Sequence, residues 1–260
     1  MNMRVTLAAT LVGIVFSTAA DAATFLFIRD AQTIANIGQA TTPEDLVNPP
    51  LTAAGAQQAL ELADALKDLD LTAIYVSSYQ SAVQTIAPTA ARFGLTPVAE
   101  PAIREWSFGD GTTPLDNAAV FAMFGEWISG NTAARIAGVP DSESLDDLAG
   151  RVVPAYRSIF DAHKDEDGVV AIVGHGGSIG WAMPYFAENV PLLFALANNL
   201  RNTGIVEVRM DSAGRPVVAN WDGIAFEIEE PTPVPLPASG VMLLAALGGI
   251  GALRRRVRAA

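Results

Sequence analysis

The chain of 260 residues has a formal net charge of −12, half of its residues are apolar, and it contains no cysteine. This length suits one sizeable α/β domain with peripheral segments, and the absence of cysteine excludes a fold held together by disulfides. The acidic balance argues against nucleic acid and anionic membrane surfaces as bulk partners, because both would repel the protein.

The first 22 residues are typical of a secretory signal peptide. Arg4 provides the charged start, residues 7–16 form the apolar core, and Ala20-Asp21-Ala22 forms a small-x-small cleavage site. A transmembrane anchor is the alternative, but the apolar run is too short to favour one. We therefore predict export, with the mature body beginning at residue 23.

Two short apolar runs of this body end in polar residues. Phe25–Ile28 leads into Arg29 and Asp30, and Val169–Val173 leads through a glycine into His175. Continuous apolar runs of this length predict buried central strands. In open α/β sheets, ligands bind where such strands end, so we expect a site built from both runs.

Strands and helices alternate along the rest of residues 23–228. The other predicted strands are 71–76, a short strand at Val98, 204–210 and 216–221, and the predicted helices start after Thr52, cover 82–93, resume at 145–160 and follow again at 178–188. This alternation indicates βαβ units and a mainly parallel sheet. The segment between Gly111 and Arg151, with a helical patch at 118–128, is interpreted as an insertion over the crevice.

The composition changes sharply at Glu229. Residues 229–237 form a proline-rich linker, and residues 238–260 contain an apolar stretch that ends in an arginine cluster. This stretch is slightly shorter than the ~20 residues that a transmembrane helix prefers, and the arginines would keep its end in the cytoplasm. The order of Val234-Pro-Leu-Pro-Ala-Ser239, apolar helix and arginines resembles the VPLPA variant of PEP-CTERM sorting signals.

That resemblance implies an inner-membrane partner and a destination. An exosortase-type sorting enzyme would recognise the tail transiently during export through the inner membrane. The protein would then reach the cell envelope or the extracellular matrix, with the segment after about Pro237 removed.

The body itself resembles the histidine phosphatase superfamily, whose relatives include phosphoglycerate mutases. Ordered motifs over residues 24–225 carry this resemblance: Arg29–Thr33 with Asn36, Leu51–Ala59, Tyr75–Thr85, Glu105 with Phe108 and Gly109, Glu143–Arg151, Gly174–Gly176, and Asn202–Ile205. The resemblance implies a three-layer α/β/α sandwich of the phosphoglycerate mutase type. It also implies that Arg29, His175 and Asn36 bind phosphate, and that Glu105 donates a proton to the leaving group.

Two positions depart from the family pattern. In the family, the residue after the first arginine is a histidine that attacks phosphorus, but Asp30 stands there in this chain. Ser81 stands where a second phosphate-binding arginine is expected. A carboxylate about 4 Å from a phosphate charge would add a repulsion of roughly 4 kcal/mol at an effective dielectric constant of about 20.

We therefore predict a catalytically inactive family member that binds a small anionic or phosphorylated ligand. The alternatives are a phosphomonoester hydrolase that works weakly or through Asp30, and a structural extracellular-matrix protein. Asp30 is expected to pair with Arg29 or to hold His175 protonated, and Arg104 is a candidate replacement for the lost arginine. His163, in a charged turn, is expected to be solvated, and neither a cofactor nor a metal is expected.

Overall fold

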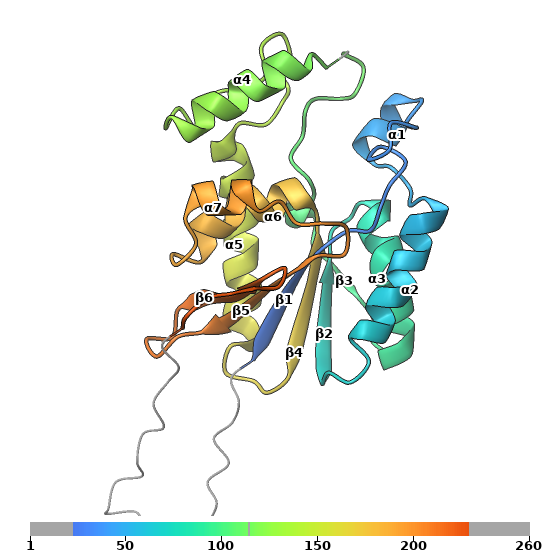
Figure 1. Cartoon of the computed structure of the whole chain (residues 1–260), viewed down its shortest axis with the longest axis vertical. Helices are drawn as coiled ribbons and strands as arrows, with labels where there is room; N and C mark the ends of the chain where they lie inside the picture. The colour runs from blue at the N-terminus through green and yellow to red at the C-terminus, as the bar shows by residue number, and fades with distance from the viewer. Residues whose placement is uncertain (1–22, 114, 229–260) are drawn as a thin grey trace, which may run out of the picture. The chain divides into compact units, whose positions relative to one another are not determined.

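A seven-stranded sheet forms the centre of the described part of the protein (Figure 1). The computed structural model describes residues 23–113 and 115–228, so the predicted signal peptide, proline-rich linker and C-terminal apolar stretch lie outside the described residues. The strands are β1 (Thr24–Arg29), β2 (Leu71–Val76), β3 (Val98–Ala99), β4 (Val169–Gly174), β5 (Ile205–Met210), β6 (Pro216–Trp221) and β7 (Ile224–Ala225).

The strand order is β3-β2-β4-β1-β5-β6-β7. The first four strands in this order pair in parallel, whereas β5, β6 and β7 extend the sheet in antiparallel pairs. The central pair β1 and β4 is in register from Thr24 opposite Val169 to Arg29 opposite Gly174. Because both strands end at the same level, the residues that follow them lie side by side.

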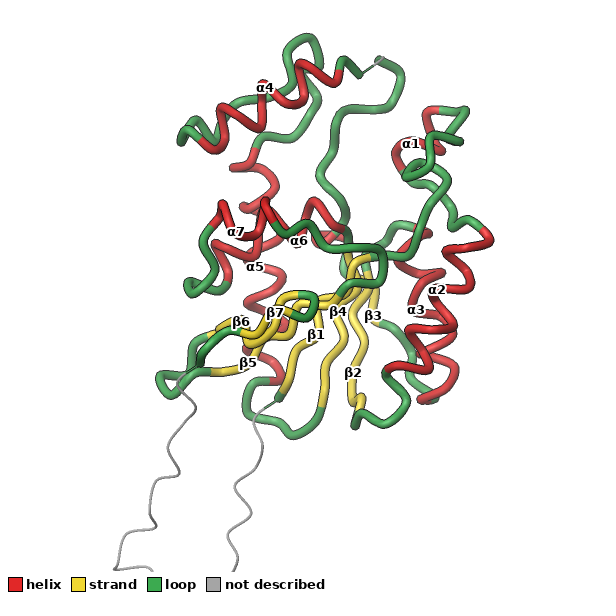
Figure 2. The backbone as a smooth tube through the Cα atoms, in the orientation of Figure 1, coloured by secondary structure: helices red, strands yellow, loops and turns green. Residues whose placement is uncertain are grey.

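Helices cover both faces of this sheet, which confirms the predicted three-layer α/β/α sandwich (Figures 1 and 2). The helices are α1 (Pro43–Val47), α2 (Ala53–Ala65), α3 (Gln80–Phe93), α4 (Asn117–Ile128), α5 (Leu145–His163), α6 (Gly176–Phe186) and α7 (Leu192–Ala197), with one 3₁₀ turn at Pro101–Ile103. Helices α2 and α3 pack on one face, and α5 and α6 pack on the other.

Alternation along β1 divides the core between the two faces. Phe25 and Phe27 belong to the apolar cluster beneath α5 and α6, whereas Leu26 and Ile28 belong to the cluster beneath α2 and α3. Successive side chains of a strand point to opposite faces, and helices cover both faces here, so the four central positions of this strand are all apolar. The apolar run in the sequence is continuous because both faces of the strand are buried.

Local signals place most of the elements where the sequence predicts them. The hydroxyl of Thr52 caps α2 by accepting the N–H of Gly55, and Gly94 ends α3 in the left-handed conformation at a φ of 65°. Three elements were not predicted: α1, α7 and β7 are each only two to six residues long, too short for a periodic pattern. Helix α6 also begins two residues earlier than expected, at Gly176.

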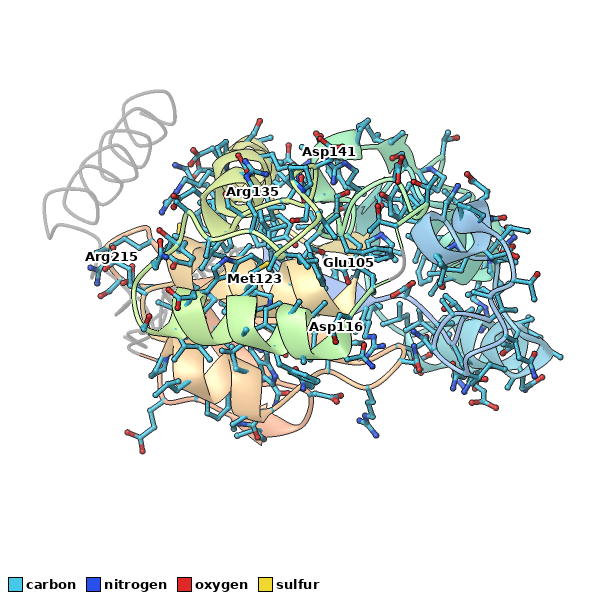
Figure 3. All side chains as sticks on the ribbon, turned by 90° about the horizontal axis from the view of Figure 1, so that it is seen from above. Glu105, Asp116, Met123, Arg135, Asp141 and Arg215 are labelled. Atoms are coloured by element: carbon cyan, nitrogen blue, oxygen red, sulfur yellow. The ribbon has the colours of Figure 1, made fainter. Side chains whose placement is uncertain are left out.

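The expected insertion between Gly111 and Arg151 contains α4. Helices α1 and α4 both lie beyond the end of the sheet at which β1, β2 and β4 finish (Figure 1). Seen from above, α4 with Met123 lies over this end of the molecule, and Glu105 lies beside it (Figure 3). Within the described residues, no helix is both long and apolar enough to cross a membrane.

Candidate active site

A cavity of about 450 Å³ opens where β1 and β4 end. The six residues that the sequence assigned to the site all line this cavity: Arg29, Asp30, Asn36, Ser81, Glu105 and His175. They come from four separate parts of the chain, and the parallel register of the central strands brings them to one edge of the sheet.

Asp30 and His175, which directly follow β1 and β4, form a buried ion pair. Oδ2 of Asp30 lies 3.3 Å from Nδ1 of His175, while Nε2 of His175 lies 2.8 Å from the hydroxyl of Ser77. Burial by itself would lower the pKa of His175, but the charge of Asp30 and its hydrogen bond outweigh burial and raise that pKa above its ordinary value. Of the two partners expected for Asp30, the structure selects the histidine.

Arg29 lies against the backbone at the start of α6. Its Nη1 donates to the carbonyl of Leu200, and its Nε is buried without a hydrogen-bond partner in the described part of the chain. A Cβ atom at Gly176 would lie 3.0 Å from this Nε, which is a tight contact, so the glycine lets the guanidinium pack closely against the backbone. Arg29 therefore faces the cavity with part of its donor capacity unused.

Ser81 occupies the first turn of α3, which approaches the cavity from the other side of the sheet. Its side chain is buried, and its hydroxyl has no hydrogen-bond partner among the described residues. One turn later, Oγ1 of Thr85 accepts the N–H of Ala31 at 2.9 Å and so holds the loop after β1. The helix that would carry a second arginine is thus in position, but the side chain at that position is short and uncharged.

The carboxylate of Glu105 is used to fix the loop that carries it. Its oxygens accept the backbone N–H groups of Trp106, Gly177 and Ser178 at 2.9, 2.9 and 2.6 Å. The last two groups belong to the first turn of α6, where a helix has unpaired N–H groups and favours negative charge. Glu105 therefore caps α6.

Asn36 is exposed at the rim of the cavity, and its side chain joins two loops. Oδ1 of Asn36 accepts the N–H of Thr33 at 3.0 Å and the side-chain amide of Asn202 at 3.2 Å. The same amide of Asn202 donates to the carbonyl of Asp30 at 3.1 Å. This bridge stabilises the loop that presents Asp30.

The sequence comparison places this site in a known family. Residues 25–222 match the model of the histidine phosphatase superfamily, branch 1. This chain belongs to the histidine phosphatase superfamily. No functionally curated protein matches it in sequence.

Several solved structures share the fold. YhfR of Bacillus stearothermophilus is 25% identical with a TM-score of 0.63, covering 79% of this chain and 98% of its own. A mutant phosphoserine phosphatase from Entamoeba histolytica in complex with phosphoserine is 19% identical (TM-score 0.62; 78% and 98% covered). A mycobacterial glucosyl-3-phosphoglycerate phosphatase in complex with VO3 is 20% identical (TM-score 0.59; 76% and 98% covered).

Arg104 does not replace the arginine that is absent at position 81, contrary to the sequence-based expectation. Its guanidinium pairs with Glu143 at 2.7 Å, and Arg151 binds the other oxygen of Glu143, also at 2.7 Å. Although burial opposes the charge of Glu143, hydrogen bonds from these two arginines and from the Ser107 N–H lower its pKa to about 2. Arg104 is held by Glu143 and does not line the cavity.

An aromatic wall around the cavity was missed by the sequence analysis. Trp106, Phe124 and Trp181 line the cavity and pack in a row, with ring centroids 5.5 Å apart for the first pair and 5.2 Å for the second. Tyr79 adds an edge-to-face contact of 5.3 Å with the ring of His175. These residues come from the N-cap of α3, from α4, from α6 and from a loop, so no local pattern in the sequence joins them.

His163 is not solvated as the sequence-based interpretation expected. Its Nε2 lies 2.9 Å from the hydroxyl of Tyr75 on β2, and its Nδ1 lies 2.6 Å from Glu166. These contacts fasten the end of α5 to the sheet, well away from the cavity-lining residues. Within the described residues, no group of three or more acidic, cysteine or histidine side chains is arranged to hold a metal ion.

Proposed function

We propose that this chain is an exported, catalytically inactive member of the histidine phosphatase superfamily whose cavity binds a small anionic ligand. The observation that carries this proposal is the ion pair of Asp30 with His175, with 3.3 Å between the carboxylate oxygen and the ring nitrogen. It stands at the position where the family motif has its nucleophilic histidine. The pairing supports inactivity because a carboxylate bound to a cation is a poor nucleophile.

Charge at the site supports the same conclusion. Covalent phosphoryl transfer requires a nucleophile near phosphorus and cations around the phosphoryl oxygens. Asp30 instead brings a negative charge, and Ser81 brings no charge at a position that lines the cavity. A phosphate dianion would therefore meet more repulsion and less attraction than the family's chemistry needs.

Phosphate release from an aryl phosphate tests this proposal. We would compare the protein with Asp30→Ala and with the double substitution Asp30→His plus Ser81→Arg. We expect no turnover by the natural sequence or by Asp30→Ala, and a gain by the double variant because the site geometry is otherwise present. Turnover by the natural sequence that disappears in Asp30→Ala would overturn the inactive assignment.

A hydrolase with altered chemistry is a second candidate, favoured by one observation. Ser77, His175 and Asp30 form a hydrogen-bonded row with 2.8 and 3.3 Å between neighbouring groups, the order of a serine-hydrolase triad. Against this candidate, Ser77 is fully buried, does not line the cavity, and its oxygen accepts the N–H of Tyr79. Labelling of Ser77 by a fluorophosphonate would support the hydrolase; an unlabelled protein supports the inactive assignment.

Export and sorting complete the proposal. Residues 1–22 support passage through the inner membrane, and the VPLPA-type tail within residues 229–260 supports transient recognition by an exosortase-type enzyme and a final place in the cell envelope or matrix. Mass spectrometry of the mature protein tests both ends. We expect no peptide before residue 23 and none beyond the Val234–Ser239 region, and an intact arginine tail would contradict sorting.

A further inference from the structure

The charged groups that line the cavity are already compensated, with one exception. His175 is paired with Asp30, and the carboxylate of Glu105 accepts three backbone N–H groups. Arg29 forms no ion pair within residues 23–113 and 115–228, and Nη1 is the only one of its guanidinium nitrogens that makes a hydrogen bond there. The cavity thus offers one guanidinium that pairs with no carboxylate of the described residues.

The rest of the lining is mainly apolar and aromatic. Trp106, Phe108, Phe124 and Trp181 form one wall, and Leu46, Val47, Leu196 and Leu200 are among the other lining residues. The volume of about 450 Å³ exceeds what a phosphate group alone would fill and lies in the usual range for organic ligands. Such a lining favours a ligand with an aromatic or aliphatic body.

We propose that this cavity binds a monocarboxylate with an aromatic or apolar body, in preference to a phosphate ester. The proposal rests on the proposed function, because it requires the Asp30–His175 pair to remain closed. Nε of Arg29 is buried, but Nη2 makes no hydrogen bond within the described residues and can donate a charge-assisted N–H···O bond to a carboxylate oxygen. The aromatic wall then packs against the body of the ligand.

The charge of the ligand is the reason that we expect a carboxylate to bind more tightly than a phosphate monoester. A carboxylate carries one negative charge, which Arg29 balances. A phosphate monoester carries nearly two, and the second charge would face Asp30 with no further free cation among the described lining residues. Ser81 adds a buried hydroxyl without a partner, which can bond a carboxylate oxygen but cannot neutralise a second charge.

Three ligands of the same shape test the proposal. We would titrate the protein with 2-naphthoate, 2-naphthyl phosphate and 2-naphthamide at about pH 8, where the phosphate ester carries two charges. Quenching of tryptophan fluorescence reports binding, because Trp106 and Trp181 line the cavity. We expect naphthoate to bind at least about tenfold more tightly than either other ligand, the gain typical of a charge-assisted bond.

Arg29→Met and Arg92→Met form a matched pair of variants. Arg92 is an exposed arginine of α3 that, within the described residues, pairs with Asp64 alone and does not line the cavity. Arg29→Met should weaken naphthoate binding by about tenfold and leave naphthamide within about twofold, whereas Arg92→Met should change neither. Equal or tighter binding of the phosphate ester, no effect of Arg29→Met, or no saturable binding of any ligand would overturn the proposal.

The same titration separates this inference from the proposed function. Release of 2-naphthol from 2-naphthyl phosphate reports catalysis independently of binding. Naphthol release together with a preference for naphthoate would refute inactivity alone. A preference for the phosphate ester without any release would refute the carboxylate assignment alone.

Discussion

The backbone N–H of Asp30 donates to the carbonyl of Gly174, the last residue of β4, at 2.9 Å. The side chain of Asp30 pairs with His175, the residue that follows Gly174. Two contacts therefore join the ends of β1 and β4. The parallel register fixes the first contact, and the aspartate side chain adds the second. The side chain at position 30 thus helps to hold the ends of β1 and β4 together.

Removing the charge of Asp30 should destabilise the protein in a pH-dependent way. Asp30→Asn leaves a buried imidazolium unpaired, and we expect it to lower the free energy of unfolding by about 3 kcal/mol near pH 6. The pKa of His175 is raised above its ordinary value of 6.5, so the stability from this pair is fully present below pH 6.5 and is lost as pH rises through the folded-state pKa. Urea denaturation of both proteins at about pH 6 and about pH 9 measures the difference. An equal loss at both pH values would contradict this ion pair.

The ionised carboxylate of Glu143 should contribute to the free energy of unfolding, and this contribution should be lost at low pH. Its pKa of about 2, against 4.5 in an unfolded chain, gives stability that is present above pH 4.5 and is lost as pH falls through about 2. We expect Glu143→Gln to cost about 3 kcal/mol at neutral pH and to flatten the decline of stability below pH 4.5. Denaturant titrations between about pH 2 and 7 test this. Asp116→Asn is the control, because Asp116 is exposed and caps α4 only; an unchanged acid profile in Glu143→Gln would refute the prediction.

Gly177 should not tolerate a side chain. A Cβ atom there would lie 2.7 Å from both Oε1 of Glu105 and Cδ1 of Trp106, so Gly177→Ala should displace the loop and destabilise the protein by about 2 kcal/mol. Gly180→Ala, in the same helix, is the matched control. Nothing lies within 4 Å of a Cβ atom at Gly180, and alanine favours helix, so this variant should be neutral or slightly more stable. Thermal unfolding of the pair checks the prediction, which fails if both variants behave alike.

Trp127 should anchor α4 over the cavity. Its ring is almost fully buried, lies 4.9 Å from that of Trp181, and donates from Nε1 to the carbonyl of Ala134 at 2.8 Å. Trp127→Ala should lower the free energy of unfolding by about 4 kcal/mol. Phe121→Ala removes an aromatic ring from the same helix, but Phe121 is 71% exposed, so its effect should stay within about 0.5 kcal/mol. Similar losses in both variants would show that α4 is not held by its inner face.

The sequence by itself determined the sheet and the location of the site. Apolar runs before Arg29 and before His175 predict two buried central strands, and the polar residues at their ends mark the edge at which the cavity opens. Capping residues such as Thr52 and Gly94 predict where helices begin and end. The backbone groups at a helix end lack partners within the helix, and the residue types that compensate for this can be recognised in the sequence. The absence of the family's nucleophile was also visible, since it is a matter of which residue stands at position 30.

Only the tertiary structure decided what those residues contact. The sequence left Asp30 with two possible partners and Arg104 with a possible role in the cavity, because spacing along the chain does not fix the direction of a side chain. The structure pairs Asp30 with His175 and turns Arg104 toward Glu143. The aromatic wall of Trp106, Phe124 and Trp181 needed the folded chain as well, because its members are brought together by packing between elements that are distant in sequence.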